Sequence, residues 1–189
     1  MLLSDVRITK KGRYSLYVDG EFLFSAHPEV FLRSGLAAGQ QVDIRRLEEL
    51  RLASEERTAK DRALALLSYS CRTEKQLYDK LADKNGSEAA AAAVARMAEL
   101  GLVDDSDYAR RFISDRLNLK DWGMKRIVME LRKKGVDPDV IDKAVQESEY
   151  DGRSRLAAVV ERRYLPLPAD PKEKSRMVQS LMRLGYEYD

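Results

Sequence analysis

Few of the residues that carry most enzyme chemistry are present in this sequence. Its 189 residues include one cysteine, one histidine and one tryptophan. The single cysteine, Cys71, cannot form an internal disulfide, which is typical of a protein in a reducing cytosol. Because no histidine lies near Cys71 in the sequence, we expect a small, half-buried side chain between two helices and not a reactive thiol.

The other signals of a catalytic or metal site are also missing. The one histidine, His27, precedes Pro28 in a predicted turn, where a turn or surface role is favoured over catalysis. The sequence has no zinc-type spacing of cysteine and histidine, and no GxxxxGK[ST] or GxGxxG phosphate-binding loop. We therefore predict no catalytic residue, no metal ion and no cofactor, which disfavours an enzyme.

Long apolar runs are absent as well. No stretch is long enough to span a membrane, and the first residues, MLLSDVRITKKGRY, lack the apolar core of a signal peptide. Hydrophobic residues make up 44% and charged residues 35% of the chain, a balance typical of soluble proteins rich in helix-forming residues. These features predict a cytoplasmic protein with no membrane partner.

Only the first forty residues or so show the alternation of β-strands. Apolar and polar residues alternate through the segment DVRITKKGRYSLYVDGEFLFSAH. The pair Asp19-Gly20 lies between two such runs and predicts a type I′ hairpin turn, which needs positive φ at both residues. The segment PEVFLRSG predicts a short helix that ends at Gly35, and GQQVD could add one short strand. Beyond Asp43, a predicted N-cap, we expect one long helix or two abutting helices.

One type of helix recurs three times, with a period of fifty residues. The segments LYDKLADKNG, IVMELRKKGV and MVQSLMRLGY each have two apolar residues four positions apart and a glycine near the end. A helix precedes each copy and another follows the first two, so the repeating unit has three helices. The third copy is expected to be incomplete, because the sequence stops where its last helix would begin. The paired apolar positions are Leu77 and Leu81, Ile127 and Leu131, and Met177 and Leu181.

These patterns predict a mostly α-helical fold of tandem three-helix-bundle repeats, two complete and the third truncated, with a small N-terminal antiparallel β unit. The expected domains are a β-hairpin unit over 1–42, a linker helix with repeat 1 over 43–105, repeat 2 over 106–150, and the incomplete repeat 3 over 151–189.

The segments SCRTEKQLYDKLADK, GLVDDSDYARRFISDRL and GMKRIVMELRKKGVDPDVIDKAV resemble the RecX family, the bacterial regulators of the recombinase RecA. The similarity is good from about residue 59 to 145 and looser elsewhere. It implies tandem three-helix repeats, a cytoplasmic location, no catalysis, and binding to RecA filaments in DNA recombination, repair and the SOS response. The family is thought to lie in the filament groove and to block extension or promote disassembly.

Positive charge is concentrated in one window of the chain. Nine basic and three acidic residues lie between Arg110 and Lys134, a net charge of +6, although the whole chain carries only +2. On a helical wheel of residues 123–134, the basic side chains lie opposite the apolar ones. The alternative is a solvated outer face without a partner. The predicted binding residues, for a RecA filament or DNA, are Arg110, Arg111, Lys120, Lys125, Arg126, Arg132, Lys133, Lys134, Arg155, Arg162 and Arg163.

Three further features of the same window have structural interpretations. The cluster DDSD could suggest a metal site, but carboxylates at a helix start are expected to cap it. Arg116 falls on the inward face, which predicts an ion pair with one of these aspartates. Trp122 is expected to wedge between two helices, with stacking on a base as the alternative.

The function that we predict is a non-enzymatic regulator that binds RecA filaments and mainly inhibits them. The alternative is a stand-alone helical DNA-binding protein that acts without a recombinase. The expected partners are the RecA filament and, in addition, single- or double-stranded DNA, and a monomer is the expected state.

Overall fold

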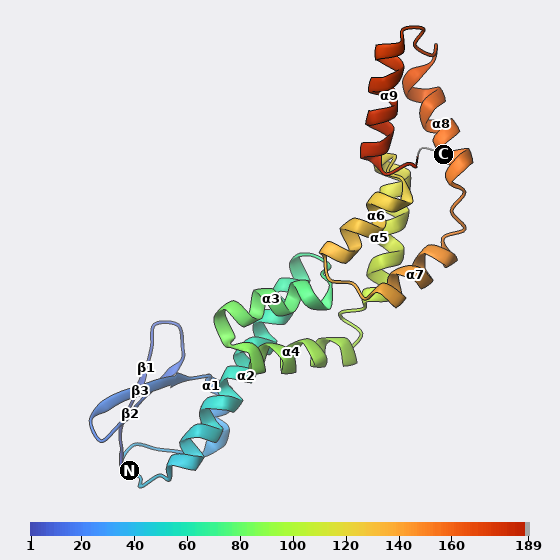
Figure 1. Ribbon diagram of the computed structural model, residues 1–189. Coiled ribbons are helices and arrows are strands. Elements are labelled where there is room, and N and C mark those ends of the chain that lie inside the picture. The colour runs from blue at the N-terminus through green and yellow to red at the C-terminus, as the bar shows by residue number, and fades with distance from the viewer. Residues whose placement is uncertain (188–189) are drawn as a thin grey trace. The chain divides into compact units, whose positions relative to one another are not determined.

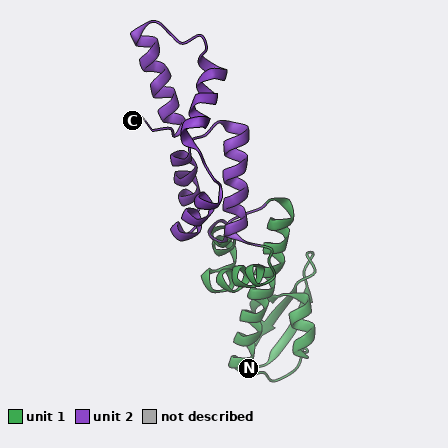
Figure 2. Cartoon of the chain, turned by 90° about the vertical axis from the view of Figure 1, so that its right-hand side faces the viewer, with its two compact units in different colours: residues 1–70, 77–102 green, residues 71–76, 103–189 purple. Residues whose placement is uncertain are grey.

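The computed structural model describes residues 1–187 and confirms a mostly helical fold with a small antiparallel sheet at the N-terminus (Figure 1). Its contacts divide the chain into two compact units (Figure 2). Unit 1 contains Met1–Ser70 and Leu77–Leu102, and unit 2 contains Cys71–Gln76 and the chain from Val103 onward.

The sheet of unit 1 has three strands in the order β1 (Leu3–Ile8), β2 (Tyr14–Val18) and β3 (Glu21–Ala26). Asp19 and Gly20, between β2 and β3, have φ values of 50° and 90°, as the predicted turn requires. The sheet packs on the start of α2 (Ile44–Tyr69), because Leu47 and Leu50 belong to the same buried cluster as Leu3 and Leu16.

The segment between the sheet and α2 matches the prediction in part. Helix α1 (Pro28–Ser34) ends at Gly35, which has a φ of 65°. The strand considered at GQQVD is not formed, and Gln41 makes only an isolated bridge with Leu2. Gly39 with a φ of 86° and the N-cap of α2 at Asp43 leave too few extended residues between them for a strand.

Helix α2 is one continuous helix of 26 residues, and Asp43 caps it by accepting from the backbone N–H of Arg45. Its second half is the first helix of copy 1, and α3 (Glu74–Asn85) and α4 (Ser87–Glu99) follow. Helices α2 and α4 pack side by side. Small side chains allow this close approach, since Ala59 and Ala63 of α2, and Ala90 and Ala93 of α4, are fully buried.

Copy 2 of the repeat consists of α5 (Asp105–Lys120), α6 (Met124–Lys133) and α7 (Pro138–Glu147). All three helices contribute to one core, in which Ile127 and Leu131 of α6 and Ile141 of α7 are fully buried. The predicted repeat positions therefore face the core, as the apolar spacing indicated.

Copy 3 contributes α8 (Gly152–Tyr164) and α9 (Pro171–Leu184) to the described residues. Its core is small, with Val159, Leu181 and Tyr186 as the buried residues. Met177, the first repeat position of this copy, is only partly buried against them.

Candidate functional site: the cationic groove of α6

Two hydrogen bonds occur at equivalent positions of the repeat, fifty residues apart, and each joins one copy to the next. Before α3, the side-chain hydroxyl of Thr73 donates to the carbonyl oxygen of Lys134 over 2.7 Å. Fifty residues later, before α6, the backbone N–H of Gly123 donates to the carbonyl oxygen of Leu184 over 2.8 Å. Each hydrogen bond links the start of one repeated helix to the end of the next copy's repeated helix. We call these contacts the first and the second joint.

Glycines allow the backbones to approach at the second joint. A Cβ atom at Gly123 would overlap the carbonyl oxygen of Gly185. A Cβ at Gly185 would lie 2.5 Å from Cβ of Arg126. The sequence predicted Gly185 as a left-handed helix cap, which its φ of 95° confirms, but the close approach to α6 was not predicted.

Asp121 ties α8 to the end of α5. This C-cap residue of α5 has a φ of 56°, and its carboxylate pairs with the guanidinium groups of Arg162 and, over 2.8 Å, Arg163. Burial raises the pKa of the Asp121 carboxyl, but the two guanidinium groups lower it by more, so that the pKa lies below its usual range. Arg155 donates to the carbonyl oxygen of Leu117. Three predicted binding residues thus have partners inside unit 2.

The predicted outward orientation of Arg126 is wrong. Its side chain is half-buried, its Nη1 donates to the carbonyl oxygen of Arg183 over 3.0 Å, and its guanidinium lies 4.1 Å from the ring centre of Trp122. The wheel placed it opposite the core of copy 2, but the end of α9 packs on that side. The last carbonyl groups of α9 have no partner within the helix, so they accept from the guanidinium.

The predicted ion pair of Arg116 is also wrong. The guanidinium lies 4.5 Å from the ring centre of Phe112 and 5.4 Å from that of Trp122, and within residues 1–187 no carboxylate pairs with it. The helix-start aspartates are about three turns away along α5, out of its reach. Trp122 packs against the core of copy 2, edge-on to Phe112 at 6.4 Å, which confirms the predicted wedge.

Among the helix-start aspartates, Asp104 is the cap of α5, as predicted. Asp104 accepts from the backbone N–H groups of Ser106 and Asp107 over 2.8 Å and 3.0 Å. Asp105 accepts from the backbone N–H of Glu74 over 2.9 Å and so strengthens the first joint. Burial raises the pKa of Asp105. Over the described residues, no group of acidic, histidine or cysteine side chains is placed to hold a metal ion.

The single cysteine and the single histidine differ in exposure. Cys71 is exposed, and the expectation of a half-buried thiol is therefore wrong. It lies in the short extended segment before α3, where the side chain of Thr73 and not that of Cys71 turns inward. His27 precedes α1 and its Nε2 lies 2.9 Å from the carboxylate of Asp61 on α2, which is a structural contact.

The predicted cations of α5 have carboxylate neighbours. Arg111 pairs with Asp107 over 2.8 Å, and Arg110 lies 3.6 Å from Glu147. Lys120 is exposed near the end of the helix. Lys134 is half-buried, with its Nζ 5.5 Å from the ring centre of Phe112. These side chains are not brought together with those of α6 in one site.

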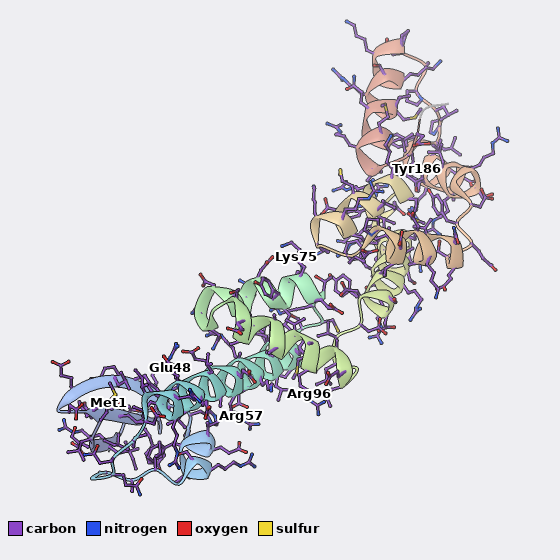
Figure 3. All side chains as sticks on the ribbon, turned by 60° about the horizontal axis from the view of Figure 1, so that its bottom comes forward. Met1, Glu48, Arg57, Lys75, Arg96 and Tyr186 are labelled. Carbon is purple, nitrogen blue, oxygen red and sulfur yellow. The ribbon has the colours of Figure 1, made fainter. Side chains whose placement is uncertain are left out.

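The cations of α6 line an open groove of about 1330 Å³ in unit 2, bounded by α6, the start of α8 and the end of α9. Figure 1 shows the end of α9 beside the start of α6, and Figure 3 labels Tyr186 at this end. We call this space the α6 groove. Its lining includes the basic residues Lys125, Arg126, Arg132, Lys133, Arg153 and Arg183.

Four of the predicted binding residues therefore lie together. Copy 3 adds Arg153 and Arg183, which are outside the predicted binding set but belong to the basic residues that could extend the surface if the copies stack side by side. Arg183 stands fifty positions after Lys133, so the period itself was a signal that could have found it. Glu187 is the one acidic residue among the described groove residues, and it lies 3.5 Å from Lys125. The arrangement can bind a negatively charged partner.

Tandem three-helix copies joined by a repeated contact define a helical repeat protein, a class in which each copy packs mainly on its neighbours. Within the described residues, no helix has both the length and the hydrophobicity needed to cross a membrane. Family models match the chain as the N-terminal domain of regulatory protein RecX at residues 5–43, the first RecX three-helix domain at 59–97 and the second at 104–145. The chain belongs to the RecX family of regulatory proteins.

Individual relatives agree with this assignment. Regulatory protein RecX of Levilactobacillus brevis is 34% identical over 185 residues, which cover 95% of this chain and 69% of the relative. The RecX protein of Caldanaerobacter subterraneus is 31% identical over 182 residues, 96% of this chain and 89% of the relative.

Solved structures of the family have the same fold. A crystal structure of regulatory protein RecX superposes with a TM-score of 0.67 at 26% identity, and covers 98% of this chain and 94% of its own. The structure of RecX from Lactobacillus salivarius gives 0.61 at 26% identity over 72% of this chain and 92% of its own. The predicted resemblance is therefore confirmed.

Proposed function

We propose that this protein binds filaments of the RecA recombinase through the α6 groove and restrains their activity in DNA recombination and repair. The observation that carries the proposal is the gathering of six basic side chains from two copies around one groove, with a single carboxylate among the described residues. Family membership supports a regulatory role. The protein acts as a cytoplasmic monomer in this proposal and performs no catalysis.

The groove presents charge that contributes little to the fold. Lys125 and Lys133 have side chains 73% and 61% exposed, and the pairs that they form, with Glu187 over 3.5 Å and with Glu130 over 3.0 Å, are surface pairs of small energy. Within residues 1–187, no carboxylate pairs with Arg132 or Arg183, and Arg153 has an electrostatic interaction with the nearby carboxylate of Asp151 but no ion pair. Uncompensated positive charge on a surface attracts nucleoprotein filaments, because both the DNA phosphates and acidic protein segments are negative. Arg110, Arg111 and Lys120 are secondary candidates outside the groove, and Lys134, Arg155, Arg162 and Arg163 have internal partners.

The test replaces three groove cations that the fold does not need. The variant Lys125→Gln, Arg132→Gln, Lys133→Gln should bind RecA filaments on single-stranded DNA ~tenfold or more weakly than the parent. The difference in affinity between parent and variant should be larger at low salt, because exposed charges are screened less there. Its inhibition of ATP hydrolysis by the filament should fall in parallel. The matched control, Lys10→Gln, Lys11→Gln, Arg45→Gln, removes the same charge from exposed positions of unit 1 and should bind like the parent.

The outcomes separate the candidate functions. Equal filament binding by the two variants would contradict a role for the groove cations. A parent protein that binds duplex DNA tightly but shows no affinity for the recombinase would favour the stand-alone DNA-binding protein instead.

A further inference from the structure

We propose that the α6 groove binds an amphipathic acidic segment of a partner protein, in which apolar side chains lie between carboxylates. This inference rests on the proposed function for the location of the site and goes further by assigning the chemistry of the occupant. It follows from the floor of the groove, the charge at its edges, and the orientation of the aromatic residues that line it.

The floor of the groove is apolar and flexible. Met124, Val128 and Met129 come from α6, Leu156 from α8 and Met182 from α9. Met129 and Met182 are 49% and 55% exposed, and both line this groove together with the other apolar residues, so that an apolar surface and not a single side chain is open to a partner. Unbranched thioether side chains adapt to apolar groups of varied shape, and methionine is common in grooves that bind peptides.

The edge of the groove carries the opposite charge to the partner that we propose. Arg132 and Arg183 have no carboxylate partner in the described part of the chain, and Arg153 has an electrostatic interaction with Asp151 without an ion pair. Lys125 does have one, but its 3.5 Å pair with Glu187 is exposed on both sides. Such a pair contributes little, and a carboxylate of a partner can replace it. Cations around an apolar floor match a segment with carboxylates beside an apolar stripe.

Single-stranded nucleic acid fits the same groove less well. Its bases bind by stacking on exposed aromatic faces. The aromatic residues of the lining are Tyr150, which is half-buried against the core of copy 2, and Tyr186, which is 6% exposed. Trp122, which lies under the guanidinium groups of Arg126 and Arg116, is also unavailable. The apolar surface that the groove exposes is aliphatic, which favours side chains of a protein.

The volume also fits a peptide. A groove of about 1330 Å³ exceeds the range of ~300–1,000 Å³ that is typical of sites for small ligands. A short helix or an extended segment with several apolar side chains would fill it.

A direct test uses a labelled synthetic peptide of about 20 residues with leucine at every third or fourth position and glutamate on both flanks of the stripe. The peptide should bind the parent protein saturably in fluorescence anisotropy. A second peptide with glutamine in place of glutamate, and an oligo(dT) of about 20 nucleotides, should each bind about tenfold more weakly. Absence of saturable binding by the acidic peptide, or tighter binding of the oligonucleotide, would overturn the proposal.

Matched variants connect this binding to the floor of the groove. Met129→Glu with Met182→Glu should weaken binding of the acidic peptide about tenfold or more, because it adds like charge and removes apolar contact. Met129→Leu with Met182→Leu should stay within about threefold of the parent. Leu32→Glu with Leu119→Glu changes two leucines that are 66% and 73% exposed outside the groove and should have no effect. Equal loss in the two glutamate variants would place the binding elsewhere.

The same proteins distinguish failure of this inference from failure of the proposed function. A parent that binds the acidic peptide but not RecA filaments retains the groove assignment and contradicts the recombinase as partner. A parent whose filament binding is unchanged by Met129→Glu with Met182→Glu retains the recombinase and contradicts an apolar contact in the groove.

Discussion

Copies 2 and 3 contain the same repeated helix, but copy 2 has a much larger hydrophobic core than copy 3. Copy 2 closes three helices around a core in which Ile127, Leu131 and Ile141 are fully buried. In copy 3 the corresponding residue of the repeat, Leu181, is 8% exposed, and its core contains two further buried residues among those described, Val159 and Tyr186. A core of this size contributes little, so copy 3 depends on the second joint and on Asp121 for its position.

The two joints also differ, because the first contains more side-chain hydrogen bonds than the second. The first uses the side chain of Thr73, which also accepts from the backbone N–H of Gln76 over 3.2 Å, and it adds the carboxylate of Asp105. The second uses the backbone of Gly123, without side-chain capping, and is supported by Arg126. The repeat therefore conserves the place of the contact while the chemistry at that place changes along the chain.

The largest expected effect is the loss of stability when a leucine of the copy 2 core is shortened. Leu131→Ala should lower the free energy of unfolding of unit 2 by roughly 2–5 kcal/mol, because it leaves a cavity in a complete core. Leu181→Ala should cost less, because the side chain is 8% exposed and its smaller core can collapse. Urea unfolding followed by circular dichroism measures both values. Equal costs would show that copy 3 has a core as complete as that of copy 2.

An intermediate effect is expected at the second joint. Gly123→Ala places a methyl group against the backbone of Gly185, so it should destabilise by about 1–3 kcal/mol. Amide hydrogen exchange should become faster in α9 and stay slow in α6. Gly86→Ala is the control, since it meets only the strain of a φ of 80° with no atom near the new Cβ. Equal loss of protection in α9 for both variants would contradict the importance of the joint.

A smaller effect should distinguish, by its pH dependence, the Asp121 contact that holds α8 from the Asp105 contact at the first joint. The folded pKa of Asp121 lies below its usual value of 3.8, so its stabilisation is present above that pH and is lost as the pH falls through the lowered pKa. Burial raises the pKa of Asp105, so its contribution is largest below its ordinary pKa of 3.8 and declines as the pH rises through the raised value. Acidification should therefore loosen α8 and α9 before it loosens the first joint.

The variant Asp121→Asn isolates this dependence. It should lower stability near neutral pH by about 1 kcal/mol, because two charge-assisted contacts become weak ones. The difference between parent and variant should shrink as the pH falls well below 3.8. A difference that stays constant across this pH range would mean that the carboxylate charge of Asp121 is not what holds α8.

The smallest effect is expected at the surface of α6. Arg132→Ala should change the free energy of unfolding by less than about 0.5 kcal/mol, because the side chain is exposed and has no carboxylate partner within the described residues. Binding of RecA filaments should nevertheless weaken. A stability loss as large as that of Leu131→Ala would contradict the assignment of inner and outer faces on this helix.

The sequence could predict which positions of each helix face the core, but not what the next copy places on the outer face. Helical spacing identified Ile127 and Leu131 correctly, because the periodicity belongs to a single helix. It misplaced Arg126, because the end of α9 covers that part of α6. The groove combines four predicted residues of copy 2 with Arg153 and Arg183, whose position beside α6 depends on how copy 3 packs and not on the periodicity of one helix.

The predicted domain boundaries stay predictions. At the boundary after residue 42, the sheet packs on the helix that follows it. Leu47 and Leu50 of α2 share the buried cluster of the sheet, so a chain that begins at residue 43 would expose both side chains. Sequence patterns locate the start of a helix well, but the partner on which its first turns pack lies far away in the chain.

The joint between copies has a consequence for how such a chain can change in length. Thr73 and Gly123, and Lys134 and Leu184, are each fifty positions apart. Duplication or removal of fifty residues would bring the same two positions of the repeat together again, whereas an insertion within a repeated helix would shift one position away from the other. The length of the protein is thus adjustable in whole modules that share the place of this contact, while the chemistry of each contact can differ.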